Sequence, residues 1–314
     1  MNFTKIILLS VLILILKLNK FANAEIKSKI IAKIGGEIIT NFDVENKIRT
    51  NLFLAGEEIN QFNVDKIKSF ALKSLVNLKL KKNEIKKYEL KTNSQAIDQH
   101  LTQITNNLKI NKAELINRFQ IYDINYDQFL EDINTEFLWQ SLIAKIYIDR
   151  IQINEEQINI ELMNILKNKK NKIEVNLSEI EITYENSEDQ IKVLNEINDS
   201  IKNIGFEKTA IKFSASTTAL NGGKLGWINL EQLSPEISKI IKNLQVGEVS
   251  PPIKKANVIT FLQLIKKRNS PIQNVLNKDK LKIALENNKK NELLNLYSNS
   301  HLSKIKNTTL IEFQ

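Results

Sequence analysis

A glycine-rich stretch, Asn221-Gly222-Gly223-Lys224-Leu225-Gly226-Trp227, decides how this chain of 314 residues is interpreted. Glycine adopts positive φ without steric cost, so the consecutive glycines at 222 and 223 predict a sharp reversal of the backbone. Gly226 is expected to let the backbone pass close beneath Trp227, whose ring would form the floor of a small domain. A phosphate-binding loop is excluded, because the glycine spacing is wrong and Leu225 follows the lysine. The stretch therefore indicates a fold and leaves the activity open.

The segments around this stretch predict a compact α/β unit. The expected elements are, in order, a strand at 175–182, a helix at 190–204, a Leu-Ser-Pro-Glu-Ile segment at 233–237, a glycine-proline turn at 246–253 and a strand at 259–265. Five of the chain's eight glycines and three of its four prolines lie between residues 205 and 268. Such a concentration of turn-forming residues is typical of a small, turn-rich domain.

The order and spacing of these segments resemble the parvulin (rotamase) domain, which would cover residues 173–268. The Phe213-Ser214 pair also falls where that family places it, between the long helix and the glycine-rich stretch. The whole chain resembles the SurA family of periplasmic chaperones, with one parvulin domain where the best-known members have two. The resemblance implies an α+β protein, in which a mainly helical chaperone core carries an inserted α/β parvulin domain.

The resemblance also implies the positions of a site. A parvulin-like site grips the proline ring in an apolar pocket and favours the twisted amide, whose rotation passes a barrier of ~18–20 kcal/mol. The family's two histidine positions are occupied here by Glu179 and Thr260, and its acid or cysteine position by Ser216. Apolar side chains fill the substrate-binding positions, namely Leu225, Leu233 and Ile237. Catalytic residues stay unassigned, and we expect the isomerase activity to be weak or absent.

Residues 1–24 have the parts of a secretory signal peptide: Lys5, an apolar run over residues 6–16, and the small residues Ala22 and Ala24. The apolar run is shorter than the roughly 20 residues that a membrane-spanning helix needs. We therefore expect cleavage after about Ala24, export to the periplasm and no stable membrane insertion. A retained membrane anchor is the alternative.

Residues 25–166 are predicted to form the helical N-terminal domain. A hairpin over residues 30–39 with a turn at Gly35-Gly36 precedes Thr40, which has the character of a helix N-cap answered by Asp43. Later helices are expected to open at Ser94, Lys112, Asn125 and Asn154, with Gln128 at the capping-box position of the third of these. The periodic apolar residues along them are expected to be ordinary core.

Two further segments complete the predicted organisation. The polar stretch at residues 167–172 is interpreted as a linker to the parvulin domain. Residues 272–314 are expected to return to the helical core, with a helix from about Lys278 to Tyr297. An extended tail over residues 308–313 would then pair with the N-terminal hairpin.

Composition excludes several classes of function. Cysteine is absent, and His100 and His301 are the only histidines, so thiol chemistry is excluded and a zinc site or Ser-His-Asp triad has little material. No cofactor and no metal are predicted. The formal charge of +9 is spread along the chain instead of forming a stripe, so nucleic-acid binding is not expected.

The leading interpretation is a periplasmic chaperone that binds unfolded outer-membrane protein precursors, or other extended polypeptides, and assists their folding. Two alternatives stay open. One is an active peptidyl-prolyl isomerase with a divergent site, and the other is a membrane-tethered parvulin-type foldase.

Overall fold

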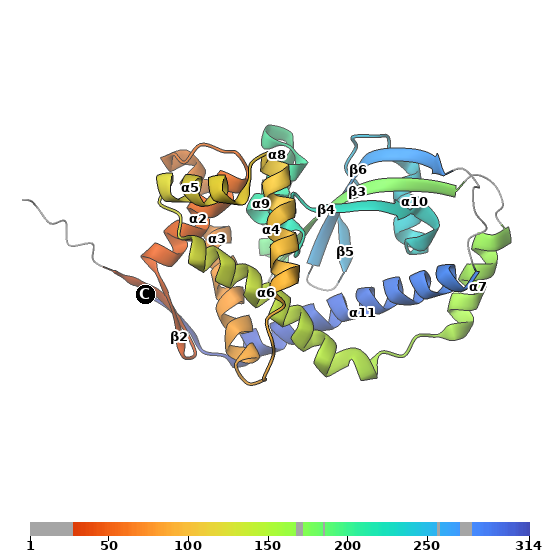
Figure 1. The fold of residues 1–314 in the computed structure, drawn as a ribbon, viewed down its shortest axis with the longest axis horizontal. Helices are drawn as coiled ribbons and strands as arrows, with labels where there is room; N and C mark the ends of the chain where they lie inside the picture. Colours follow the sequence, from red (N-terminus) through yellow and green to blue (C-terminus); the bar gives the residue numbers. More distant parts are fainter. Residues whose placement is uncertain (1–27, 168–171, 185, 256–257, 271–277) are drawn as a thin grey trace, which may run out of the picture.

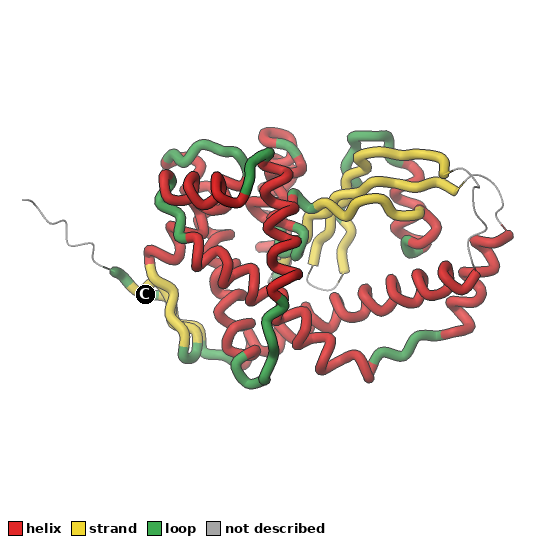
Figure 2. The backbone as a smooth tube through the Cα atoms, viewed as in Figure 1, coloured by secondary structure: helices red, strands yellow, loops and turns green. Residues whose placement is uncertain are grey.

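The computed structural model describes residues 28–167, 172–184, 186–255, 258–270 and 278–314. Within these ranges, the protein combines helices with a three-stranded sheet and a four-stranded sheet, so the α+β class is confirmed (Figures 1 and 2). The predicted signal peptide at residues 1–24 and the central part of the predicted linker, residues 168–171, lie outside the described residues. None of the helices in the described ranges is long and apolar enough to cross a bilayer.

The three-stranded sheet joins the two ends of the described chain. Its strands are β1 (Ile30–Ile34), β2 (Glu37–Thr40) and β7 (Ile311–Phe313), in the order β2-β1-β7. Strand β1 is antiparallel to both neighbours, which confirms that the C-terminal tail pairs with the N-terminal hairpin. The preceding helix, α11 (Lys278–Thr308), continues well past the predicted end at Tyr297, because no glycine or proline interrupts it. The last strand is correspondingly shorter than predicted.

The helical body follows the first hairpin. Its helices are α2 (Asn41–Leu54), α3 (Gln61–Ile85), α4 (Ser94–Leu108), α5 (Lys112–Ile121), α6 (Tyr126–Tyr147), the short 3₁₀ helix η1 (Ile148–Arg150) and α7 (Glu155–Lys167). Asparagine or threonine side chains cap the N-termini of the α-helices, as predicted at Thr40, Asn125 and Asn154. The Thr40–Asp43 capping box is confirmed. Gln128 departs from its predicted role, because its side-chain amide donates to Asp43 at 2.9 Å instead of returning to its own N-cap.

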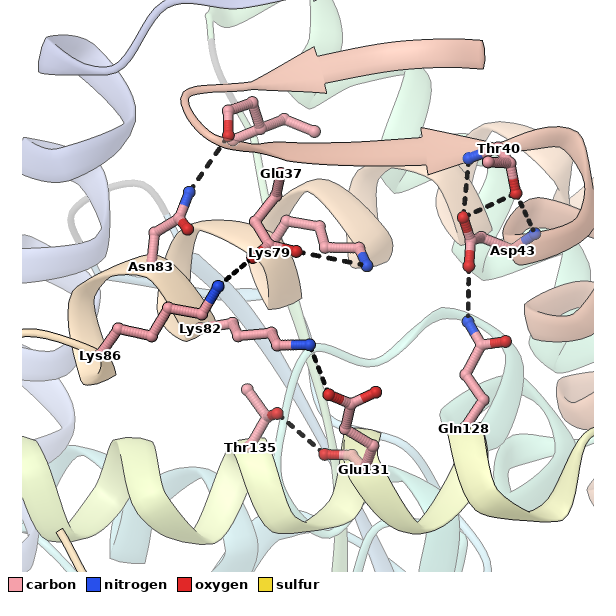
Figure 3. A network of polar contacts seen from close by, with 11 residues as sticks. Glu37, Thr40, Asp43, Lys79, Lys82, Asn83, Lys86, Gln128, Glu131 and Thr135 are labelled. Carbon is pink, nitrogen blue, oxygen red and sulfur yellow. Dashed lines mark hydrogen bonds and ion pairs between the residues drawn. The ribbon is translucent and has the colours of Figure 1, made fainter. Parts of the chain in front are cut away.

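A polar network fixes the hairpin onto the helices (Figure 3). The Glu37 carboxylate of β2 contacts the ammonium groups of Lys86, the C-cap residue of α3, and, at 3.8 Å, of Lys79 on α3. Burial raises the pKa of Glu37, but the hydrogen bond and the charges of these lysines outweigh it and leave that pKa below its usual value. Asn83 of α3 donates to the carbonyl oxygen of Ile34 at 3.1 Å. The hairpin is therefore fixed to α3 by charge as well as by packing.

The α/β unit contains the four-stranded antiparallel sheet, in the order β4-β3-β6-β5. Its elements are β3 (Lys172–Thr183), α8 (Ser187–Ile204), α9 (Phe206–Phe213), η2 (Ala219–Asn221), β4 (Lys224–Asn229), η3 (Leu230–Gln232), α10 (Pro235–Asn243), β5 (Ile253–Lys255) and β6 (Val258–Ser270). Strand β3 lies in the middle and pairs with both β4 and β6. The predicted strands and helices of this unit are therefore present in the predicted order.

The α/β unit and the helical body share one apolar core. Buried residues of α2 and α3 belong to the same cluster as buried residues of β3, α8, α9 and β6. At this junction the rings of Phe70 on α3 and Phe213 on α9 meet edge to face, with centroids 4.7 Å apart. On the other side, α11 runs from α7 past the four-stranded sheet toward the three-stranded one, and its Glu292 pairs with Lys255 of β5 at 2.5 Å (Figure 1). The α/β unit is thus docked on the helical body.

Candidate functional site

The two faces of strand β3 have different surroundings. Successive side chains of a strand point to opposite faces, and β3 itself is regular, since both register shifts beside it leave an unpaired residue in the neighbouring strand. Ile180 and Ile182 are buried in the core shared with the helical body. The other face carries Val175 and Leu177 near one end, followed by two glutamates. We call this second face, from Val175 to Glu181, the open face.

The apolar end of the open face brings together the predicted substrate-binding residues. Leu225, Leu233 and Ile237 all pack against one cluster, whose fully buried members include Val175 and Leu177. Ser234 accepts a hydrogen bond from the backbone N–H of Ile237 at 3.4 Å and caps α10, and the following proline suits the first helical turn. The structure thus brings these three side chains together, and their role in substrate binding stays a prediction.

The acid end of the open face gathers the predicted polar positions. The Glu179 carboxylate accepts a hydrogen bond from the Ser216 hydroxyl at 2.5 Å and another from the Thr218 hydroxyl at 3.0 Å. Thr260 of β6 lies directly opposite Glu181 in the strand register, which places both side chains on the same face. Glu179, Ser216 and Thr260 are thus brought to one end of the sheet. Sequence reasoning missed Thr218, which carries no signal of its own.

Gly223 holds the acid end against the glycine-rich turn. The backbone N–H of Glu179 donates to the carbonyl oxygen of Gly223 at 2.8 Å. A Cβ atom at Gly223 would lie 2.1 Å from the backbone oxygen of Glu179, and the φ of Gly223 is +74°. The predicted close approach at Gly226, beneath Trp227, is therefore wrong, and a different close approach, to the backbone of Glu179, occurs at Gly223. Gly226 has φ of +79° with nothing within 4 Å of a built Cβ, so it is needed for its conformation alone.

Glu181 was not predicted as part of the site. It alternates with Glu179 along β3, so the period-2 pattern of the strand was a usable signal. Burial, and then the neighbouring charge of Glu179, raises the pKa of Glu181 to about 7. Burial also raises the pKa of Glu179, although the hydrogen bonds from Ser216 and Thr218 oppose the rise. Within the described residues, neither carboxylate forms an ion pair.

The acid end faces a cavity of about 470 Å³ between the α/β unit and the helical body. Glu179, Glu181 and residues 212–217 line one wall. Helices α3, α6 and α11 supply the opposite wall, which combines the aromatic rings of Phe70 and Trp139 with serine and asparagine side chains. Cavities of this size and mixed lining commonly accommodate a ligand or a short peptide segment. No pattern in the sequence pointed to this cavity, because segments far apart in the sequence form it.

Two buried polar groups in the cavity wall lack hydrogen-bond partners among the described residues. One is the ammonium of Lys212, a residue only 3% exposed, and the other is the side-chain oxygen of Asn51, 6% exposed. Burial lowers the pKa of Lys212, and the charge of Glu57 opposes that change. A buried polar group without a partner costs roughly 1–3 kcal/mol, so both groups lower the stability of the fold where they lie.

Three sequence expectations are resolved at the edges of the site. Trp227 does not form the floor of the domain: it is 39% exposed on β4, and the Arg268 guanidinium lies over its ring at 4.0 Å. The histidines lie elsewhere, His100 edge-on to Phe137 and His301 within 2.8 Å of the Tyr147 hydroxyl. The polar centre of the site is therefore built from carboxylates and hydroxyls.

Two family models match the chain. One is described as a SurA-like N-terminal domain and matches residues 2–143, and the other is described as a PPIC-type PPIase (rotamase) domain and matches residues 165–266. Together they account for the helical body up to α6 and for nearly all of the α/β unit. The site described above lies where the second model meets the helical body.

The chain is also similar to individual proteins. A chaperone SurA of Pseudomonas putida is 31% identical over 49% of this chain and 37% of its own length. A chaperone SurA of Hydrogenovibrio crunogenus is 22% identical over 78% of this chain and 56% of its own length. This chain thus spans about half the length of such relatives. A solved structure from work on two SurA-like chaperones of Campylobacter jejuni is 15% identical, covers 91% of this chain and 98% of its own, and overlays with a TM-score of 0.34.

Proposed function

Because the chain combines a SurA-like N-terminal domain with a PpiC-type parvulin domain, we propose that it is a periplasmic chaperone for unfolded outer-membrane protein precursors. The observation that carries this proposal is the cavity of about 470 Å³ between the helical body and the open face of β3. An extended polypeptide entering this cavity would meet aromatic rings on one wall and strand β3 on the other. Such a mixed surface suits segments of varied sequence.

The parvulin domain is proposed to bind polypeptide with weak or no isomerase activity. Its apolar cluster of Leu225, Leu233 and Ile237 is suited to hold a proline ring. The adjoining polar centre consists of Glu179, with its two hydroxyl donors, and Glu181. Rotation about an X–Pro bond is favoured where the twisted amide meets low polarity, and ionised carboxylates oppose that condition. This chemistry supports a binding role over catalysis.

Suppression of aggregation tests the chaperone role. An unfolded outer-membrane β-barrel protein is diluted from urea, and light scattering is followed with and without the whole chain. We expect suppression at near-stoichiometric amounts. Removing residues 173–268 would be a poor test, because the helical body and the α/β unit share one core. A variant that fills the cavity, Ala215→Trp at an exposed position of its wall, is a sharper one.

Ala215→Trp has a matched control in Ala113→Trp, at an exposed position on α5 away from the cavity. We expect Ala215→Trp to weaken suppression several-fold and Ala113→Trp to leave it unchanged. Equal suppression by the two variants would place polypeptide binding outside the cavity. No suppression by the unaltered chain would contradict the chaperone role itself.

A proline-peptide isomerisation assay separates binding from catalysis. We expect the unaltered chain to accelerate the isomerisation little above the spontaneous rate. A clear acceleration that is lost in Leu225→Ala or Leu233→Ala would instead establish the alternative, an active isomerase with a divergent site. Export is tested separately by mass spectrometry of the mature N-terminus, where a start at about Glu25 is expected and an intact Met1 would favour the membrane-tethered foldase.

A further inference from the structure

The cavity beside β3 is lined by charges of both signs, and only some of them have an ion-pair partner among the described residues. Six charged side chains line it: Lys73, Lys81, Glu136, Glu179, Glu181 and Lys212. Two of the cations are already paired, Lys81 with Glu136 at 2.7 Å and Lys73 with Asp189 at 3.1 Å. The two β3 carboxylates and Lys212 form no ion pair with described residues. The unmatched charges are therefore an acidic pair in one wall and one buried cation.

The acidic pair and Lys212 are separate features. The charges of Glu57, Lys66 and Lys208 shift the pKa of Lys212, whereas the charge of Glu179 shifts the pKa of Glu181. Glu57 is itself paired with Lys208 at 2.8 Å, so it does not neutralise Lys212. A ligand that complements the charges open to the cavity must therefore bring a cation to the glutamates, whereas the Lys212 ammonium and the Asn51 side-chain oxygen are enclosed by the protein.

An extended peptide with a basic side chain supplies such a cation. Its lysine or arginine side chain matches the two carboxylates. We propose that the cavity selects polypeptide segments that carry a lysine or arginine side chain, with Glu179 and Glu181 as the recognition residues. This inference rests on the proposed chaperone function and adds a charge preference to it.

The position of the acidic pair further specifies the segment. On the open face of β3, Glu179 follows Leu177, and Leu177 belongs to the cluster that Leu225, Leu233 and Ile237 join. A strand rises about 3.3 Å per residue, so the two ends of this face are a few residues apart. A proline or other apolar side chain in the cluster would thus place a residue close to it in sequence against the carboxylates. The preferred segment has a basic residue near an apolar one.

Matched peptides test this preference. Two fluorescent peptides of identical apolar and proline content are compared, one with arginine and one with citrulline, which has nearly the same shape without the charge. Fluorescence anisotropy is measured with the whole chain at pH 8. We expect the arginine peptide to bind about tenfold more tightly, the order expected for a charge pair in a partly buried site. Equal affinity of the two peptides would overturn the proposal.

Variants of the whole chain identify the carboxylates responsible. The double variant Glu179→Gln, Glu181→Gln should bind both peptides alike, while Glu174→Gln should keep the arginine preference. Glu174 is a suitable control because it lies on the same strand, outside the cavity, paired with Arg268 at 2.6 Å. Circular dichroism checks that each variant is folded. An arginine preference that survives in the double variant would contradict the assigned role.

A change of pH and a charge-reversal variant test the same proposal independently. Lowering the pH to 5.5 protonates Glu181 and should weaken the arginine preference of the unaltered chain without weakening citrulline-peptide binding. The variant Glu181→Lys should prefer a glutamate peptide over the arginine peptide, and an unchanged order of affinities would contradict the proposal. If neither peptide binds the unaltered chain, the proposed polypeptide-binding function fails as well. If both bind equally, only the charge preference fails.

Discussion

The apolar end and the acid end of the open face follow each other along strand β3, but different requirements determine which residues they carry. At the apolar end, Val175 and Leu177 are fully buried and contribute to the core of the α/β unit. At the acid end, Glu179 and Glu181 face a cavity and contact hydroxyl groups and open space. Stability constrains the first pair, whereas we propose that a ligand constrains the second. The apolar cluster of a parvulin-type fold can therefore be retained while the polar positions beside it change their chemistry.

The largest loss of stability is expected when the acid end is pushed away from the glycine-rich turn. In Gly223→Ala, the new Cβ would lie 2.1 Å from the backbone oxygen of Glu179, at a φ of +74°. Overlap with backbone cannot be relieved by a rotamer change, so we expect a loss of about 4 kcal/mol or more of unfolding free energy. Urea denaturation of the whole chain measures this loss.

Gly226→Ala is the matched control for this substitution. Its φ of +79° is equally unfavourable for alanine, but nothing lies within 4 Å of the built Cβ. We expect it to cost about 1 kcal/mol, for the backbone conformation alone. Similar losses in the two variants would mean that the contact with Glu179 is unimportant.

Truncation at the apolar end should cost nearly as much. Leu177 is 0% exposed, and Leu177→Ala leaves a cavity in the cluster that lies beneath the proposed proline pocket. Leucine-to-alanine changes in cores cost about 2–5 kcal/mol, and we expect a value near the middle of that range. Leu310→Ala, at a side chain 70% exposed, should be close to neutral. A neutral Leu177→Ala would contradict the claim that stability fixes this end.

The acid end should behave in the opposite way, because its residues lower the stability of the fold at neutral pH. The pKa of Glu181 is raised to about 7, so the folded state binds more protons than the unfolded state between about pH 4.5 and 7. Stability contributed by the protonated carboxyl is therefore lost as the pH rises through this range. Allowing for partial exposure, we expect this loss to be about 1–3 kcal/mol.

Glu181→Gln tests this pH dependence. Glutamine resembles the protonated carboxyl and does not titrate, so the variant should be more stable than the unaltered chain at pH 8 and nearly equal to it at pH 5. Thermal unfolding monitored by circular dichroism across this pH range measures the difference. Parallel stability curves for the two proteins would show that Glu181 titrates normally.

The same contrast explains what the sequence could predict. The strand, the glycine turn and the apolar pocket residues follow local rules of alternation, positive φ and proline placement, and those rules held. Errors arose where a residue's partner is distant in sequence. The close backbone approach was assigned to Gly226 because nothing local shows that Gly223 meets Glu179. Trp227 was expected in the core, but it lies on an exposed strand face beneath Arg268.

The cavity was beyond sequence reasoning for the same physical reason. It depends on how α3, α6 and α11 lie against β3 and the loop after α9, and each of these segments has an ordinary amphipathic or extended pattern. Lys212 looks like one more surface lysine in a lysine-rich chain. Only its position between the helical body and the α/β unit makes it a buried ammonium without a hydrogen-bond partner among the described residues.

The smallest expected effect concerns the rim of the cavity, where Lys73 of α3 pairs with Asp189 of α8 at 3.1 Å. The Lys73 side chain is 40% exposed, so Lys73→Gln should cost only about 0.2–1 kcal/mol, and less at high salt. Lys73 does not contribute to the pKa of Glu181, although both residues line the cavity. The variant should therefore keep the fall in stability between pH 5 and pH 8. A Lys73→Gln protein with a steeper fall would indicate that Lys73 already neutralises the acidic pair, which would then lack the free charge needed to select a basic segment.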